Sequence, residues 1–103
     1  MQIRAAKKGR LLQVKLMGEL DHHSAPRFAE QMDAMIEHGA DIRILQLDLG
    51  ELTFMDSSGI GVLMGRYKRM AQLGGSLQVR NESRNIERIM RLTGLYQVIE
   101  HIG

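Results

Sequence analysis

The sequence at residues 43–67 is RILQLDLGELTFMDSSGIGVLMGRY, a strand pattern followed by a helix pattern. Residues 43–49 are almost continuously apolar, which is typical of a strand that is covered on both faces. A polar corner at Gly50-Glu51 and the short apolar segment 52–55 then lead into Asp56-Ser57-Ser58-Gly59. Apolar residues recur at helical spacing after it, at Ile60, Leu63, Met64 and Tyr67. The stretch predicts that an inner strand delivers a polar turn to the start of a helix, outside the edge of a sheet.

The residues upstream predict two strands joined by a tight turn. The strands cover residues 3–8 and 11–17, and Gly9 supplies the turn. The second strand alternates between apolar and polar residues, which is typical of a strand with one buried face. Residues 18–23 are expected to form a loop before the first helix.

Two further helices have start and stop signals in the sequence. Ser24 offers an N-cap to the first helix, and Pro26 lies in its first turn, where the missing N–H costs little. This helix is expected to end at Gly39. Ser83 is expected to cap the last helix, which ends at Gly94.

The order of the elements predicts the fold class. The central helix ends at Gly74-Gly75, and short strands are expected at 76–80 and 95–99. The order strand-strand-helix-strand-helix-strand-helix-strand predicts an α/β layer sandwich with helices packed against a sheet. Because the sequence contains no repeat, linker or low-complexity tract, we expect residues 1–103 to form one domain.

The composition excludes several classes of function. The 103 residues include no cysteine, so there is no disulfide, thiolate metal site or cysteine nucleophile. A formal net charge of +2 is too small to indicate nucleic acid as a partner. The N-terminus does not resemble a signal peptide, and no apolar run approaches the roughly 18 residues of a membrane span. We expect a cytoplasmic protein without a membrane span.

The Asp56-Ser57-Ser58-Gly59 turn has a structural and a functional interpretation. In the structural one, its polar residues only cap the helix. However, one N-cap suffices, and if Asp56 or Ser57 fills it, the Ser58 hydroxyl is free and points outward. Gly59 and Gly61 each cost the helix up to about 1 kcal/mol relative to alanine, which indicates close approach of a partner or a neighbouring element.

Phosphorylation is a modification that a helix start tolerates. A phosphate on Ser58 would bring about −1.5 to −2 charges, and the N-terminus of a helix favours added negative charge. Asp56 and a desolvated partner surface would repel it. The sequence therefore predicts a switch at the surface rather than in the fold, with Ser57 helping to hold the helix start.

Three motifs resemble those of a known family. They are GELDHH at 18–23, FMDSSGIGVL at 54–63 and GRYK at 65–68. Together they resemble the anti-sigma-factor antagonists of the STAS domain family, in particular the sporulation antagonists of spore-forming bacilli. The resemblance implies a mixed, mostly parallel sheet packed with helices.

The resemblance also implies partners and a mechanism. The antagonist binds an anti-sigma factor that is also a serine kinase, and so frees a sporulation sigma factor. The kinase phosphorylates Ser58, which abolishes binding, and a metal-dependent serine phosphatase restores the active form. The antagonist is a substrate and a binder rather than an enzyme, and it needs no cofactor. Partner-binding residues implied alongside Ser58 are Asp21, His22, His23, Asp56, Ser57, Gly59, Ile60 and Gly61.

Two other functions use the same residues. One is a nucleotide- or metabolite-sensing STAS module that holds a ligand phosphate at the start of the central helix. The other is a small serine hydrolase, in which His22 or His23 acts as base and Asp21 orients it. The sequence lacks a G-x-S-x-G elbow, and the four histidines do not have metal-ligand spacing.

Three arginines form a stripe on the last predicted helix, at Arg84, Arg88 and Arg91. Such a stripe is usually a solvated face. The functional alternative is a surface that steers an acidic partner toward the protein.

Overall fold

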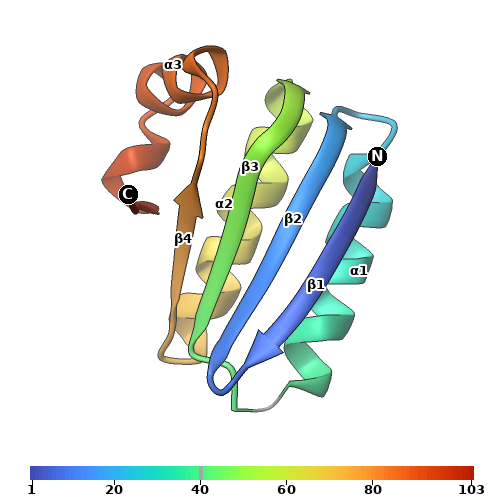
Figure 1. The fold of residues 1–103 in the computed structure, drawn as a ribbon, viewed down its shortest axis with the longest axis vertical. Coiled ribbons are helices and arrows are strands. Elements are labelled where there is room, and N and C mark those ends of the chain that lie inside the picture. The colour runs from blue at the N-terminus through green and yellow to red at the C-terminus, as the bar shows by residue number, and fades with distance from the viewer. Residues whose placement is uncertain (40) are drawn as a thin grey trace.

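The strands form one five-stranded sheet in the order in which they occur along the chain. The computed structural model describes residues 1–39 and 41–103. β1 (Gln2–Lys8) pairs antiparallel with β2 (Leu11–Leu20). The other neighbours pair in parallel, through β3 (Ile44–Met55), β4 (Ser76–Arg80) and β5 (Glu100–His101) (Figure 1). This confirms the mixed, mostly parallel sheet that the resemblance implied.

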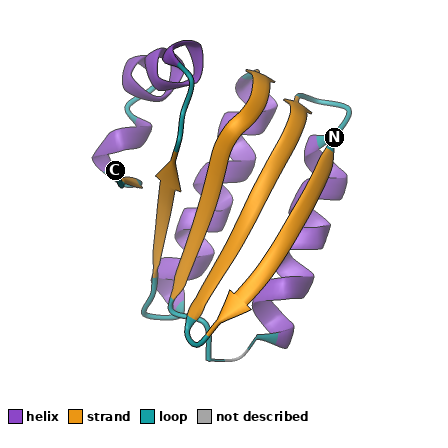
Figure 2. Cartoon of the chain, viewed as in Figure 1, coloured by secondary structure: helices purple, strands orange, loops and turns teal. Residues whose placement is uncertain are grey.

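The two long helices cover one face of this sheet. α1 (Ala25–His38) and α2 (Ser57–Gln72) lie behind the strands in Figure 1, and the opposite face is open toward the viewer. α3 (Arg84–Leu92) follows β4 at the end of the sheet where β2 and β3 also end, and a short 3₁₀ turn, η1 (Leu95–Gln97), leads on to β5 (Figure 2). The predicted order of elements and the α/β layer sandwich are confirmed.

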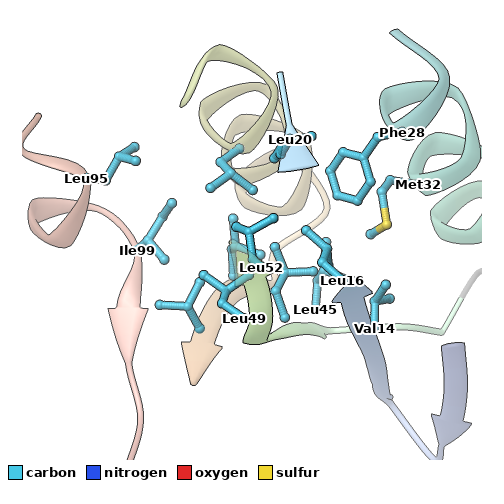
Figure 3. Close-up of a cluster of buried hydrophobic side chains, with 14 of the residues drawn as sticks. Val14, Leu16, Leu20, Phe28, Met32, Leu45, Leu49, Leu52, Leu95 and Ile99 are labelled. Carbon is cyan, nitrogen blue, oxygen red and sulfur yellow. The ribbon is translucent and has the colours of Figure 1, made fainter. Parts of the chain in front are cut away.

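The core lies between the sheet and the helices. Leu45, Leu47 and Leu49 of β3 are fully buried on the helix side. From α1, Phe28 and Met32 face the end of β2 (Figure 3). Apolar residues of the sheet and of the helices therefore form one continuous core.

The prediction that 43–49 is covered on both faces is wrong. Gln46 and Asp48 alternate with the buried leucines and lie on the open face of the sheet, in register with β2 and β4. The segment looked continuously apolar because Ile44 directly precedes Leu45, although Ile44 is only half-buried. The strand has one buried face, as a sheet covered on one side requires.

The predicted corner at Gly50-Glu51 is also wrong, because β3 runs through it without interruption. Its long partner β2 likewise continues to Leu20, and the pairing of β2 with β3 contains two register shifts. The predicted loop at 18–23 therefore begins only at Asp21. Such shifts are β-bulges, which let paired strands continue past irregular residues. The last strand is displaced too, since residues 95–97 form a 3₁₀ turn and β5 covers only 100–101.

The predicted helix caps differ in outcome. Ser83 caps α3 as expected, with its hydroxyl accepting a hydrogen bond from the Ile86 N–H at 3.2 Å. Ser24 stands at the N-cap position of α1, but its side chain makes no cap hydrogen bond. Its hydroxyl instead donates to the Glu19 carbonyl at 2.8 Å and accepts from the Asp21 N–H at 3.0 Å. Ser24 therefore holds the loop that precedes the helix.

Candidate functional site

Asp56 is the N-cap of α2. Its Oδ1 accepts hydrogen bonds from the Ser58 N–H at 2.9 Å and the Gly59 N–H at 3.1 Å. The expectation that Ser57 helps to hold the helix start is therefore wrong. In the described part of the chain, neither serine hydroxyl takes part in a hydrogen bond, and Ser57 is exposed while Ser58 is half-buried. Both hydroxyls are free for chemistry or for contact with a partner.

The two glycines of the first turns have different reasons to be glycine. Gly59 is buried, and a Cβ there would lie 2.5 Å from the Leu20 carbonyl oxygen and 2.8 Å from Met55 Cγ. The close approach that the sequence indicated is thus made by the neighbouring strand β2. Gly61 is exposed, and a Cβ there would meet nothing within 4 Å among the residues that the structure describes. Of the two glycines, only Gly61 has its surface open to a partner.

The structure brings the loop before α1 next to the start of α2. Asp56 Oδ2 accepts a hydrogen bond from the His22 N–H at 3.1 Å and lies 3.6 Å from His22 Nδ1. Asp21 Oδ1 accepts from the N–H groups of His23 at 2.9 Å and Ser24 at 3.0 Å. The rings of His22 and His23 lie 4.0 Å apart between centroids. Residues 34 positions apart in the sequence therefore form one polar surface.

Both aspartates of this surface are held in the ionised form. Burial acts to raise the pKa of Asp56, but hydrogen bonds from the backbone N–H groups of Gly59, His22 and Ser58 outweigh it and lower the pKa. The pKa of Asp21 is lowered chiefly by the hydrogen bond from the Ser24 backbone. The N–H groups at the start of α2 are thus already matched with negative charge.

An exposed aromatic ring at this site was missed by the sequence reasoning. Phe54 is 45% exposed, whereas Phe28, the other phenylalanine of the chain, is 1% exposed. Phe54 lies opposite Glu19, directly after a register shift between β2 and β3. Because this shift breaks the alternation of the strand, periodicity did not indicate which way residue 54 faces. The ring adds an apolar element beside the polar turn.

The remaining predicted residues are distributed as follows. Ile60 is half-buried and packs against the core, so only part of its side chain faces outward. The stripe on α3 is exposed at Arg84, Arg88 and Arg91, and Arg91 pairs with Glu87 at 2.6 Å.

The geometry does not assemble the hydrolase arrangement. In the described chain, no hydrogen bond joins either serine hydroxyl of the turn to His22 or His23. The residues described also contain no group of three His, Cys, Asp or Glu side chains suited to a metal ion. Within the same residues, no helix has the length and apolar character that crossing a bilayer requires.

Comparisons with known proteins agree with this fold. A family model described as "Mlab, STAS domain" matches residues 3–100. An anti-sigma-B factor antagonist of Bacillus subtilis (strain 168) is 39% identical over 89 residues, which cover 86% of this chain and 79% of that protein. An anti-sigma F factor antagonist of Paenibacillus polymyxa is 40% identical over 89 residues, which cover 86% and 75%.

Solved structures show the same fold at lower identity. The anti-sigma factor antagonist SpoIIAA in its unphosphorylated form matches with a TM-score of 0.77 and 21% identity, over 99% of this chain and 88% of that one. An anti-sigma factor antagonist from Mycobacterium paratuberculosis matches with a TM-score of 0.85 and 22% identity, over 97% and 83%. The sheet covered on one side by helices is thus that of a STAS domain. Within that class, the chain belongs to the anti-sigma-factor antagonists.

Proposed function

We propose that the chain is a phosphorylation-switched binding protein whose unphosphorylated form binds an anti-sigma factor with serine kinase activity and releases a sporulation sigma factor. One observation carries the proposal: Asp56 caps α2, which leaves the Ser58 hydroxyl without a hydrogen bond in the described chain at a partly exposed helix start. A similar anti-sigma F factor antagonist is consistent with a sporulation sigma factor, and because an anti-sigma-B factor antagonist is about equally similar, binding to the two kinases decides between the two systems.

The docking surface of this proposal is formed by the polar turn and the loop beside it. It comprises Ser57, Ser58 and Gly61 on α2, together with His22, which Asp56 ties to the helix start, and the adjacent His23. A kinase that binds this surface meets the hydroxyl that it phosphorylates. The chain then acts as substrate and binder rather than as enzyme, and a metal-dependent serine phosphatase resets it.

Phosphorylation of Ser58 would stop binding through charge. The phosphate adds about −1.5 to −2 charges next to the ionised Asp56 and Asp21. Burying so many like charges against a partner carries a large desolvation cost. Support from a relative is that SpoIIAA is known in both unphosphorylated and phosphorylated forms.

The nucleotide-sensing alternative gains no specific support from the site. A ligand phosphate at the start of α2 needs the free N–H groups of the first turn. Those of Ser58 and Gly59 already donate to Asp56. A ligand would have to displace a carboxylate that belongs to the chain.

The test uses the serine kinase that acts on the sigma F antagonist of a spore-forming bacillus, with ATP, and intact-mass spectrometry. Ser58→Ala should gain no phosphate and keep its binding, whereas Ser57→Ala, the matched control one residue away, should gain phosphate as the natural chain does. Ser58→Asp should bind at least about tenfold more weakly, which corresponds to about 1.4 kcal/mol.

Each alternative result has a meaning in this design. Phosphate that persists in Ser58→Ala and disappears in Ser57→Ala would move the site to Ser57. Phosphorylation by a kinase of the sigma-B system alone would assign the chain to that system. If the unphosphorylated chain binds neither kinase in calorimetry, the proposed function is wrong.

A further inference from the structure

The open face of the sheet carries a hydrogen-bonded row of side chains across four strands. Gln13 Nε2 donates to Gln46 Oε1 at 2.9 Å, and Gln46 Nε2 donates to Gln78 Oε1 at 3.3 Å. Gln78 Nε2 in turn donates to Glu100 Oε2 at 3.4 Å. Since every amide donates in the same direction, the orientation of the whole row is fixed. Gln46, in the middle, is only 8% exposed.

A row of charged side chains lies next to this one, two residues further along β2, β3 and β4 and continued on β1. By register it contains Arg4, Lys15, Asp48 and Arg80. Lys15 is neutralised by Glu51 at 2.5 Å. Asp48 Oδ1 accepts a hydrogen bond from the Gly50 N–H at 3.0 Å, which directs this oxygen toward its own strand.

The two arginines of the charged row are not neutralised by a carboxylate of the described chain. Within the described residues, neither Arg4 nor Arg80 takes part in an ion pair. The Nε of Arg80 is shielded from solvent and has no hydrogen-bond partner in the described part of the chain. A buried donor without an acceptor is unfavourable, so a bound acceptor at this place would be stabilised.

A hollow of about 340 Å³ lies over both rows. Its lining includes Arg4, Arg80, Gln13, Gln46 and Asp48. The volume is at the lower end of the roughly 300–1,000 Å³ that small-molecule sites occupy. The lining residues Gln46 and Asp48 lie on the face of β3 opposite its buried leucines, so the hollow is separate from the core. Figure 1 shows that α1 and α2 cover the other face of the sheet.

We propose that this hollow binds a small molecule through an oxyanion, a phosphate or carboxylate group, held between Arg4 and Arg80. Guanidinium groups match the geometry of such oxyanions and form strong charge-assisted hydrogen bonds with them. Their two positive charges outweigh the single carboxylate of Asp48. The side-chain amides of Gln13 and Gln46, whose orientation is fixed by the row, then face the uncharged part of the bound small molecule.

The proposal is tested by NMR titration of the ¹⁵N-labelled chain at constant ionic strength. Pyrophosphate and citrate serve as the probes, so the phosphate and carboxylate chemistries are distinguished, and sodium chloride is the reference salt. Saturable shifts are expected at the Arg80 Nε–H and at the side-chain amides of Gln13 and Gln46. Arg80→Gln should weaken binding of the preferred probe about tenfold or more, as the loss of a charge-assisted hydrogen bond requires.

Two variants complete the test. Arg4→Gln, on the exposed strand β1, should weaken binding as well and does not disturb the core. Arg88→Gln, which removes the same charge from exposed α3, should bind as the natural chain does. The proposal is overturned if no saturable shift occurs below about 10 mM of either probe, if Arg88→Gln loses as much affinity as Arg80→Gln, or if the shifts centre on the backbone N–H groups of Ser58 and Gly59.

Discussion

Replacing two glycines of the same helix by alanine should have opposite effects on stability. Alanine at either position removes the conformational freedom of glycine in the unfolded chain and favours the helix by up to about 1 kcal/mol. At Gly61 no atom of residues 1–39 or 41–103 lies within 4 Å of the added Cβ, apart from the local backbone of its own helix. Gly61→Ala should therefore stabilise the protein by about 0.5–1 kcal/mol.

At Gly59 the added methyl group meets the strand. The added Cβ would lie 2.5 Å from the carbonyl oxygen of Leu20, at the end of β2. The same oxygen accepts a hydrogen bond from the Asp56 N–H at 3.3 Å. The backbone at that place has little freedom to move. Overpacking of this kind costs about 1–3 kcal/mol, which exceeds the helical gain. Gly59→Ala should be destabilised by about 1–2 kcal/mol net.

The pair is measured by urea unfolding and by thermal midpoints. For a domain of this size, 1 kcal/mol corresponds to about 4–8 °C, so the two variants, which differ by about 1.5–3 kcal/mol, should differ by roughly 6–24 °C. If Gly59→Ala is as stable as the natural chain, the close packing of α2 on β2 is refuted. Gly61→Ala also tests the docking surface when its binding to the proposed kinase is measured. Its methyl group would stand on that surface while the fold stays stable, so a change in affinity would not come from unfolding.

Three further outcomes follow from the same structure. Phe28→Ala, in the core, should lose about 3–5 kcal/mol, whereas the exposed Phe54→Ala should lose less than about 1 kcal/mol in urea unfolding; equal losses would contradict the burial difference. Tyr96→Phe should cost about 1–2 kcal/mol, because the Tyr96 hydroxyl donates at 2.6 Å to Glu82, whose side chain is fully buried; an unchanged midpoint would contradict that hydrogen bond. The lowered pKa of Asp21 supplies stability that is present above about pH 4 and is lost as the pH falls through its folded pKa, so Asp21→Asn should flatten the acid side of the stability profile; an unaltered profile would contradict it.

The fold was largely predictable because its elements have local signals. The alternation in β2 and the helical spacing after Asp56 each come from the period of one element. The Ser83 cap is equally local, since hydroxyl and N–H are three residues apart. For these elements, whose features depend on neighbours in sequence, the residue pattern was sufficient. The expected roles of Ser24 and Ser57 at helix starts are the local exceptions.

The errors fall where the structure depends on neighbours in space. Gly50 stands inside β3 because β2 continues to pair alongside it, and this partner lies far away in the sequence. The open face was not predicted because Ile44 next to Leu45 hid the alternation of β3, and Gln46 is buried by the row of amides from other strands rather than by a layer of helices. At the site, the sequence placed Asp21 and His22 on the surface of Ser58 by resemblance only. Their link to the helix start is the hydrogen bond between His22 and Asp56, which joins two loops.

The hydrogen bonds of Asp56 also explain why a phosphate on Ser58, as proposed, would alter the surface more than the fold. Its two oxygens accept from three backbone N–H groups, those of His22, Ser58 and Gly59. A phosphate could gain these donors only by displacing a carboxylate whose pKa they already lower. It would therefore project outward, with the general attraction of the helix N-terminus for negative charge offsetting repulsion from Asp56. Folding stability then changes little, while a partner that covers the turn must desolvate both anions.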